Sequence, residues 1–537
     1  MSETTISPPG TVNRRQVARS TTIVMLLFIA SRVLGLFREA VIGQRFGDLP
    51  EYAAYLAAFR LPDLLFNLVA GGALASAFIP TLTQYLTRND EAGSWRLTSA
   101  VANWLLLVLS AIAILAGIAA PLLVVTVIAP GFADTPAQVD LTVNLLRLLL
   151  VSTVTFSISG LVMGVLNAHD HFLFPAVAPV LYNLGILGGA LFLAPTMGVY
   201  GLAIGVIVGA AAHLLIQIPT LYGLGFRYWA SLGRQDPPIF AGVRQMVRLM
   251  GPRVIGAGAV QLMFVANTIL ASYYASSVLP ALNYAWIIML LPHGIFASSI
   301  ATAIFPTFSR MAATRDQDGM RRALSQILRV LLFVVIPCAV GLFVLRVPII
   351  ELLFQRGQFT ATTTQAVAWA LGFYAFGLIA HACIEIVNRA YYALQDTRTP
   401  VTIAVGAMLL NILLSVLLIP VVGDPTSVVR GPQGALALAN TLASTLEMVL
   451  FLWFLRPKMG GIDGTRLLAS TLRMGIAAAL MGLTLWGLLQ SPLAALSIWL
   501  FVPAAIGIGV VVYVVVAWLL RVEEMQTLTR LLLRRNE

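Results

Sequence analysis

Three ionisable side chains stand close together in the first long apolar segment, residues 20–44. The stretch reads Ser31-Arg32-Val33-Leu34-Gly35-Leu36-Phe37-Arg38-Glu39. A charge near the centre of a bilayer costs roughly 2.5–3.5 kcal/mol on insertion scales, so lipid-facing positions are unfavourable for these three groups. On a helix, Arg32, Gly35 and Glu39 share one face, and Arg38 points about a third of a turn away. We therefore expect a helix that lines a hydrated cavity for an anionic ligand.

Each of these residues also has a structural interpretation. Arg32 and Arg38 could instead pair with a neighbouring carboxylate or with carbonyl groups at a helix end. Glu39 follows Arg38 directly, and adjacent side chains do not face each other on a helix, so Glu39 is equally expected to pair elsewhere. Arg60 lies near Pro62 and Asp63 and could form a local ion pair. For Arg147, snorkelling toward water explains the position as well as ligand contact does.

A second group of ionisable residues lies further along the chain. His381, Glu385 and Arg389 follow one another at four-residue intervals in the segment 363–392. Glu before Arg at this spacing is a favourable helix pair, so a stabilised helix end is the simplest explanation. The alternative is a site that couples transport to protons or cations. Glu447 is an isolated carboxylate in the segment 432–455 and is a second candidate for coupling.

The composition identifies the class of protein. Apolar residues make up 59% of the 537 residues and charged residues only 10%, which a soluble protein of this length could not bury. The chain is therefore predicted to be an all-α polytopic membrane protein. The net charge of +11 does not indicate nucleic-acid binding, because the basic residues are dispersed between apolar segments.

Fourteen apolar segments are long enough to span a membrane. Arginine and lysine residues divide 25 to 4 between the alternate ends of these segments, with four left inside the spans. The positive-inside rule therefore predicts fourteen helices with both termini in the cytoplasm. The segments are residues 20–44, 53–86, 97–129, 139–166, 172–195, 199–222, 243–274, 280–309, 323–354, 363–392, 400–420, 432–455, 467–489 and 494–520.

An internal repeat organises these segments. Ala75-Ser76-Ala77-Phe78-Ile79-Pro80-Thr81-Leu82 resembles Ala301-Thr302-Ala303-Ile304-Phe305-Pro306-Thr307-Phe308, an offset of 226 residues. Six crossings per copy give both copies the same orientation, which predicts two parallel-repeat six-helix lobes with a cavity between them. The predicted parts are a cytoplasmic tail (1–19), an N-lobe (20–225), a C-lobe (226–460), two extra C-terminal helices (461–520) and a second cytoplasmic tail (521–537). Gly71-Gly72 is expected to mark a bend.

Several motifs are absent from the sequence. There is no phosphate-binding loop, no metal-binding His or Cys pattern, and no Gly-x-Ser-x-Gly elbow. The chain is therefore predicted not to be an enzyme and to need no cofactor. Transport would then be driven by a gradient, with Na⁺ or H⁺ as the coupling ion, or by the membrane potential.

The order of the motifs resembles the MurJ (MviN) family of lipid II flippases. The resemblance is carried by Ser31-Arg32-Val33-Leu34-Gly35 with Arg38-Glu39, Phe59-Arg60-Leu61-Pro62-Asp63, Ala77-Phe78-Ile79-Pro80, Ala129-Pro130-Gly131-Phe132-Ala133-Asp134-Thr135, Phe174-Pro175-Ala176 with Asn183, Leu353-Phe354-Gln355-Arg356-Gly357, and Gln395-Asp396-Thr397-Arg398. It implies the MOP exporter superfamily fold, in which residues 461–520 form a lipid-tail groove. It also implies alternating-access transfer of undecaprenyl-pyrophosphate-linked peptidoglycan precursor to the outer leaflet.

The resemblance implies roles for particular residues. Arg32 and Arg38 match the family's cavity arginines on the first helix, Arg60 a basic position on the second, and Glu39 an acidic neighbour. Three positions depart from the pattern, because Phe66 and Ile287 stand where other members have arginine and Ala53 stands at an acidic position. The cavity is therefore expected to be less positive than is usual in the family.

The expected location is the bacterial inner membrane, with lipid II, membrane lipids and cell-wall synthesis machinery as partners. Three other functions fit the sequence. The chain could flip another undecaprenyl-linked oligosaccharide, export drugs in an ion-coupled manner, or be a non-transporting homologue. Drug export calls for an acidic cavity, whereas this first helix is basic.

Overall fold

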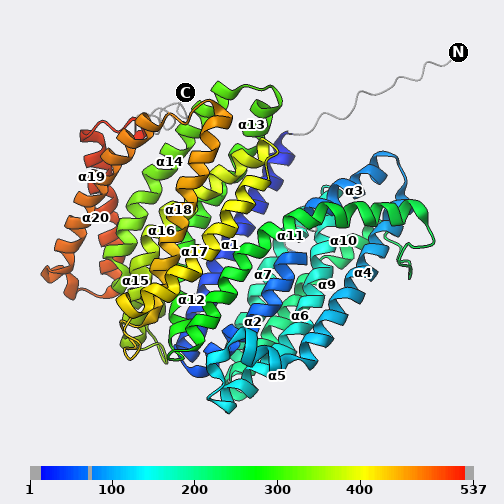
Figure 1. Cartoon of the computed structure of the whole chain (residues 1–537), viewed down its shortest axis with the longest axis horizontal. Coiled ribbons are helices and arrows are strands. Elements are labelled where there is room, and N and C mark those ends of the chain that lie inside the picture. The colour runs from blue at the N-terminus through cyan, green and yellow to red at the C-terminus, as the bar shows by residue number, and fades with distance from the viewer. Residues whose placement is uncertain (1–13, 70–74, 526–537) are drawn as a thin grey trace. The chain divides into compact units, whose positions relative to one another are not determined.

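The computed structural model describes residues 14–69 and 75–525, and these ranges contain helices and no strand (Figure 1). The predicted bend at Gly71-Gly72, residues 1–13 of the first tail and residues 526–537 of the second lie outside them. The first helices are α1 (Arg14–Phe46), α2 (Pro50–Val69), α3 (Ala75–Thr87), α4 (Glu91–Ile118), α5 (Ala120–Leu123), α6 (Pro136–Ala168), α7 (Leu173–Gly188), α8 (Ala194–Met197), α9 (Val199–Leu215) and α10 (Ile218–Gly223). The others are α11 (Pro237–Ser272), α12 (Val278–Pro292), α13 (Ser298–Ala313), α14 (Gln317–Val344), α15 (Arg346–Phe354), α16 (Ala361–Ala393), α17 (Arg398–Val422), α18 (Pro432–Leu455), α19 (Gly464–Leu489) and α20 (Ile498–Leu519).

The described residues of the fourteen predicted segments are predominantly helical, which confirms the all-α fold class. Within the described residues, eleven helices are long and apolar enough to cross a membrane. The remaining three predicted spans correspond to α1, to α2 with α3, and to α11. In the case of α11, the apolar stretch Val260–Ser272 is shorter than the others.

The chain forms two compact units that do not follow the chain order. The first comprises Met1–Val41, Leu61–Ala119 and Leu145–Gly251, and the second comprises Ile42–Arg60, Ala120–Asn144 and Pro252–Glu537. Four helices, α1, α2, α6 and α11, contribute residues to both units. The predicted division into lobes at residue 225 stays a prediction.

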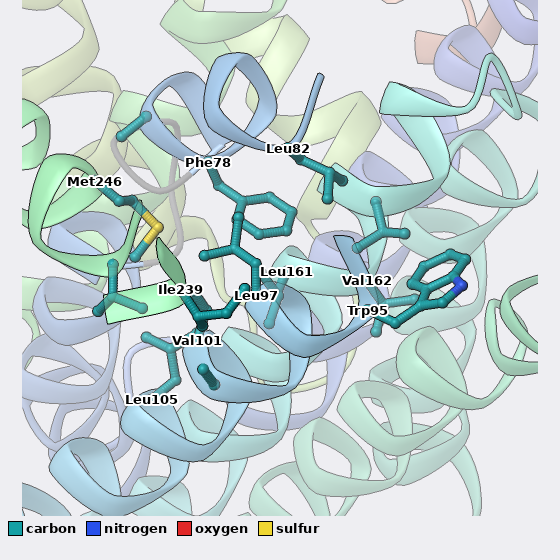
Figure 2. Close-up of a cluster of buried hydrophobic side chains, with 14 of the residues drawn as sticks. Phe78, Leu82, Trp95, Leu97, Val101, Leu105, Leu161, Val162, Ile239 and Met246 are labelled. Atoms are coloured by element: carbon teal, nitrogen blue, oxygen red, sulfur yellow. The ribbon is translucent and has the colours of Figure 1, made fainter. Parts of the chain in front are cut away.

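A buried hydrophobic cluster forms the core of the first unit. Phe78 on α3 is fully buried, and Trp95 at the start of α4 is 5% exposed. Figure 2 shows these side chains packed with residues of α6 and α11. The Trp95 ring also stacks on His169, with 5.3 Å between the ring centroids. Such close-packed apolar contacts hold α3, α4 and α6 as one body.

The sequence repeat extends to the helix caps. Asp90 caps α4 by accepting a hydrogen bond of 2.8 Å from the backbone N–H of Gly93. Asp316 caps α14 in the same way, accepting from Gly319 at 2.8 Å. The two aspartates are 226 residues apart, as are the two glycines, which is the offset between the Pro80 and Pro306 motifs. A carboxylate at a helix N-terminus stabilises the helix by accepting from free backbone N–H groups and by its interaction with the helix dipole. The repeat therefore preserves local capping chemistry as well as apolar pattern.

Within the second unit, α16 packs against α12, α14 and α18. The C-terminal helices α19 and α20, orange to red in Figure 1, pack against each other and against α14. The two helices beyond the sequence repeat are thus part of this unit.

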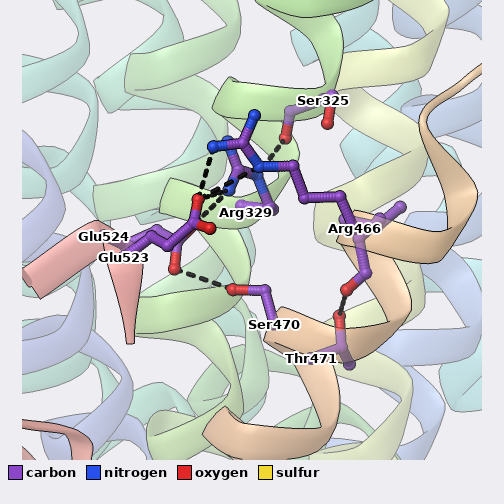
Figure 3. Close-up of polar contacts among 8 residues, drawn as sticks. Ser325, Arg329, Arg466, Ser470, Thr471, Glu523 and Glu524 are labelled. Carbon is purple, nitrogen blue, oxygen red and sulfur yellow. Dashed lines mark hydrogen bonds and ion pairs between the residues drawn. The ribbon is translucent and has the colours of Figure 1, made fainter. Parts of the chain in front are cut away.

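An ionic cluster joins the segment after α20 to α14 and α19 (Figure 3). Arg329 on α14 is 7% exposed, and its guanidinium contacts Glu523 at 2.8 Å and Glu524 at 2.9 Å. Arg466 also pairs with Glu523, at 2.6 Å, and Ser470 donates a hydrogen bond to Glu524 at 2.8 Å. Two carboxylates therefore share two guanidinium groups, one of them buried, which fixes the end of α20 on its neighbours.

Candidate functional site

The Arg38 guanidinium is held by a residue of α7. Its Nη1 donates a hydrogen bond of 2.8 Å to Oδ1 of Asn183. The amide nitrogen of Asn183 donates in turn to Oγ of Ser31 at 3.2 Å, and Asn183 is 8% exposed. Ser31 and Arg38 are seven residues apart, so they lie on one face of α1, and that face meets α7. Asn183 thus sets the position of Arg38.

Glu39 pairs with Arg38, although adjacent helical side chains ordinarily point apart. The Nη2 atom of Arg38 contacts Oε1 of Glu39 as an ion pair. Glu39 is 6% exposed, and a carboxylate so deeply buried needs a cation close by. The Arg38 guanidinium supplies that cation. Of the alternatives left open for Glu39, the structure therefore shows a pair with Arg38.

Arg32 has a different environment from Arg38. Its side chain is exposed, and it makes no hydrogen bond or ion pair with any residue that the structure describes. The apolar neighbours Val33 and Phe37 are 63% and 54% exposed. Of the two arginines, Arg32 is thus the one whose guanidinium is open to an incoming anion.

Arg60, in the second unit, contacts α11. Its Nε donates a hydrogen bond of 2.8 Å to Oγ1 of Thr268. Its guanidinium carbon lies 5.5 Å from the centre of the Phe264 ring, within cation–π range. These contacts orient the arginine along α11, and Thr268 and Phe264 were not among the residues that sequence reasoning singled out.

Arg147 has a structural partner. It lies exposed on α6, and its Nε donates a hydrogen bond of 2.9 Å to the backbone carbonyl of Gly117. Gly117 belongs to the last turn of α4, where carbonyl groups have no partner within the helix. A cation at this end also interacts favourably with the helix dipole. This contact favours the structural interpretation of Arg147.

The predicted stripe on α16 divides into two separate groups. Glu385 and Arg389 form the expected ion pair, with 2.6 Å between Oε1 and Nη2. His381 faces α18, where its Nε2 lies 3.1 Å from both Oδ1 of Asn440 and Oγ of Ser444. No hydrogen bond links His381 to Glu385 in the described part of the chain. The three residues therefore do not act as one cluster.

Glu447 lies half-buried on α18, one turn beyond Ser444. Across residues 14–69 and 75–525 its carboxylate has no hydrogen bond or ion pair. The same residues contain no group of three or more His, Cys, Asp and Glu side chains that could hold a metal ion.

The three positions that depart from the pattern implied by the resemblance differ in burial. Phe66 packs its ring edge against Phe156, with 5.2 Å between centroids. Ala53 is fully buried, and Ile287 is half-buried on α12. Phe66 and Ala53 thus occupy packed positions in which a charge would need a new partner.

Sequence reasoning did not assign Asn183 to the site. Its one signal was a place in the sequence motif Phe174-Pro175-Ala176 to Asn183, and at an offset of 228 residues Asn183 aligns with Asn411. Neither feature indicates a contact with Arg38, which is 145 residues away in sequence.

Comparisons with known proteins give one consistent result. The family model described as Lipid II flippase MurJ matches residues 42–507. A relative from Burkholderia cenocepacia, named Lipid II flippase MurJ, is 32% identical over 400 residues, or 74% of this chain and 77% of the relative. The matched range begins after Arg32, Arg38 and Glu39.

Two solved structures share the fold. A structure of "Lipid II flippase MurJ, inward closed conformation" covers 92% of this chain and 98% of its own, with a TM-score of 0.76 and 24% identity. An inward-facing multidrug resistance MATE family transporter of the MOP superfamily covers 81% of this chain and 96% of its own, with a TM-score of 0.65 and 13% identity. At these identities the likeness concerns the fold alone.

Proposed function

Because the chain belongs to the MurJ family of lipid II flippases, we propose that it moves lipid II across the bacterial inner membrane. The cargo is the undecaprenyl-pyrophosphate-linked peptidoglycan precursor, which passes from the inner to the outer leaflet for cell-wall synthesis. The protein works by alternating access, with both termini in the cytoplasm.

The pairing of an open Arg32 with a positioned Arg38 on one helix supports this proposal most directly. At a rise of 1.5 Å per residue, the two Cα atoms lie about 9 Å apart along the axis. Two long side chains from these positions can converge on a diphosphate. Guanidinium groups bind phosphate oxygens through paired hydrogen bonds, which are strong where water is excluded.

Glu39 gives the empty site a counter-ion. When no lipid is bound, the Glu39 carboxylate neutralises Arg38 and offsets the cost of its burial. A pyrophosphate carries more negative charge than one carboxylate, so it competes for the same Nη2 atom. Asn183 keeps its contact with Nη1 and holds the guanidinium in place during the exchange. Arg38 therefore exchanges one anionic partner for another and is at no stage buried without a counter-ion.

The test is replacement of the native flippase by this chain in a flippase-depleted bacterium. The readouts are growth and the accessibility of lipid II to a membrane-impermeant probe at the outer leaflet. We expect the unchanged chain to restore both, and Arg32→Ala or Arg38→Ala to abolish them at normal protein levels. Arg430→Ala, at an exposed loop arginine, is the matched control and should retain full function.

Three results would contradict the proposal or one of its parts. Lipid II held at the inner leaflet despite abundant unchanged chain would exclude lipid II as the cargo. Accumulation of a different undecaprenyl-linked oligosaccharide on depletion of this chain in its own cell would identify that lipid instead. Normal flipping by both arginine variants would remove Arg32 and Arg38 from the cargo path.

For the energy source, we propose a gradient of Na⁺ or H⁺, or the membrane potential. Glu447 is the coupling group best supported by its surroundings, since its carboxylate has no cationic partner among the described residues. Glu385 already neutralises Arg389, and His381 is engaged by α18. Glu447→Gln should therefore change the dependence of flipping on the ion gradient, whereas Glu385→Gln should not. The opposite result would transfer the coupling role to Glu385.

A further inference from the structure

A cavity of about 560 Å³ lies in the second unit where four helices end together. The helices α14 and α19 finish there, and α15 and α20 begin there. Its volume falls within the roughly 300–1,000 Å³ range of small-molecule sites. None of the ionisable residues considered above for substrate binding or coupling lines it, and six of its lining residues lie in 461–520, the segment for which the resemblance implies a lipid-tail groove.

One side of the cavity offers positive charge and hydrogen-bond donors. Arg346 is the first residue of α15, and its Nη1 donates to the carbonyl of Phe343. Its guanidinium carbon also lies 4.9 Å from the Phe343 ring centre. The N-terminus of α15 has no side-chain cap, and the positive end of the helix dipole adds to the arginine charge. This concentration of positive charge suits a phosphate group.

A carboxylate lies in the same cavity. Glu351 is five residues after Arg346 on α15, a rise of about 7.5 Å along the axis. Its carboxylate makes no ion pair or hydrogen bond with any described residue, so the two opposite charges do not neutralise each other. Gln490, at the end of α19, adds an amide to the lining. The cavity thus presents a separated cation and anion.

The remaining walls are apolar and aromatic. Phe343, Trp486 and Phe501 line the cavity beside aliphatic residues. Trp486 is 60% exposed, and Trp499 at the start of α20 is 62% exposed. Exposed tryptophans at the ends of membrane helices are typical of the interface between hydrocarbon and head groups. The cavity therefore lies at the depth at which a lipid changes from head group to acyl chain.

We propose that this cavity binds the head group of a zwitterionic phospholipid with a primary ammonium, a phosphatidylethanolamine. The phosphate contacts Arg346 and the N-terminus of α15, and the ammonium donates to Glu351. A phosphatidylglycerol head group has no cation for Glu351. A choline head group has a cation that cannot donate a hydrogen bond. The apolar wall contacts the parts of the acyl chains that are nearest the head group.

The experiment is native mass spectrometry of the full chain in detergent, titrated separately with phosphatidylethanolamine, phosphatidylglycerol and phosphatidylcholine. We expect one tightly retained phosphatidylethanolamine. Loss of either charged contact should weaken it by about tenfold or more. Glu351→Gln should weaken phosphatidylethanolamine alone, whereas Arg346→Gln should weaken phosphatidylglycerol as well. Arg430→Gln, a loop arginine outside the cavity, is the control and should change neither affinity.

Equal retention of the three lipids, or a Glu351→Gln variant that binds phosphatidylethanolamine normally, would overturn the proposal. Undecaprenyl phosphate displacing phosphatidylethanolamine at equal concentration would assign the cavity to the cargo's own lipid. If Arg346→Gln does not fold, Arg346→Lys, which keeps the positive charge, takes its place. The comparison of the unchanged chain with Glu351→Gln then decides whether the cavity binds the ammonium group. The experiment measures phospholipid binding and not lipid II transport. A negative result would therefore exclude the phosphatidylethanolamine site without contradicting the proposed flippase function.

Discussion

Arg329 provides a direct test of how buried charge stabilises the second unit. Arg329→Met removes the cation from two carboxylates that are differently exposed. Glu523, with 47% of its side chain exposed, still pairs with Arg466 in this variant, so the contribution of Glu523 to the loss of stability is small. Glu524 is 3% exposed and keeps only the hydrogen bond from Ser470. A buried charge that has lost its partner costs about 3–5 kcal/mol, and we expect a loss of stability of that size.

The assay is equilibrium unfolding in mixed micelles, with the free energy of unfolding obtained from the denaturing detergent fraction. Arg466→Met is the matched control, because 60% of its side chain is exposed and such pairs contribute about 1 kcal/mol or less. Adding Glu524→Gln to Arg329→Met removes the stranded charge and should restore at least half of the loss. Equal costs for Arg329→Met and Arg466→Met, or no restoration in the double variant, would refute the reasoning.

Three further predictions follow from individual contacts. Asn183→Leu leaves Arg38 without its α7 partner and should slow flipping about tenfold or more at unchanged protein level, measured with the outer-leaflet probe; an unchanged rate would contradict the positioning role. Arg147→Gln should lower stability by about 1 kcal/mol in the same unfolding assay and leave flipping intact, so a loss of flipping would place Arg147 in the cargo path. Partial burial raises the pKa of Asp396, but hydrogen bonds from Lys458 and Thr399 outweigh it and hold that pKa at about 2, below the unfolded value of about 3.9. The stabilisation is therefore fully present above about pH 4 and is lost as the pH falls through about 2, so Asp396→Asn should lower the melting temperature more at pH 7 than at pH 2.5; an equal decrease at both would exclude the ion pair as the cause.

The helices could be predicted well because their signal is local. Each apolar segment must satisfy its own backbone hydrogen bonds in hydrocarbon, and a helix is the solution within one segment. The pair of Glu385 and Arg389 was predictable for the same reason, since helical periodicity alone places residues four apart on one face. Among the described residues, α1, α2, α3 and α11 are the long predicted spans that do not meet the length and apolarity of the other eleven.

The candidate site was predictable only in part. Arg32 and Arg38 stand out in sequence because charge inside an apolar segment is costly. Their environments differ for reasons that the sequence does not contain. Asn183 holds Arg38 from another helix, whereas Arg32 stays open. Glu39 departs from the usual rule for adjacent side chains because burial forces it onto the nearest cation.

By itself, the sequence determined the helical class, the positions of the apolar segments and the repeat. Those properties depend on hydrophobicity and on spacing along one chain. Tertiary structure alone decided that Arg147 reaches the carbonyl of Gly117, and that Arg346 and Glu351 share a cavity with the ends of α19 and α20. Such contacts depend on how helices pack, and packing is settled by many weak contacts between segments distant in sequence.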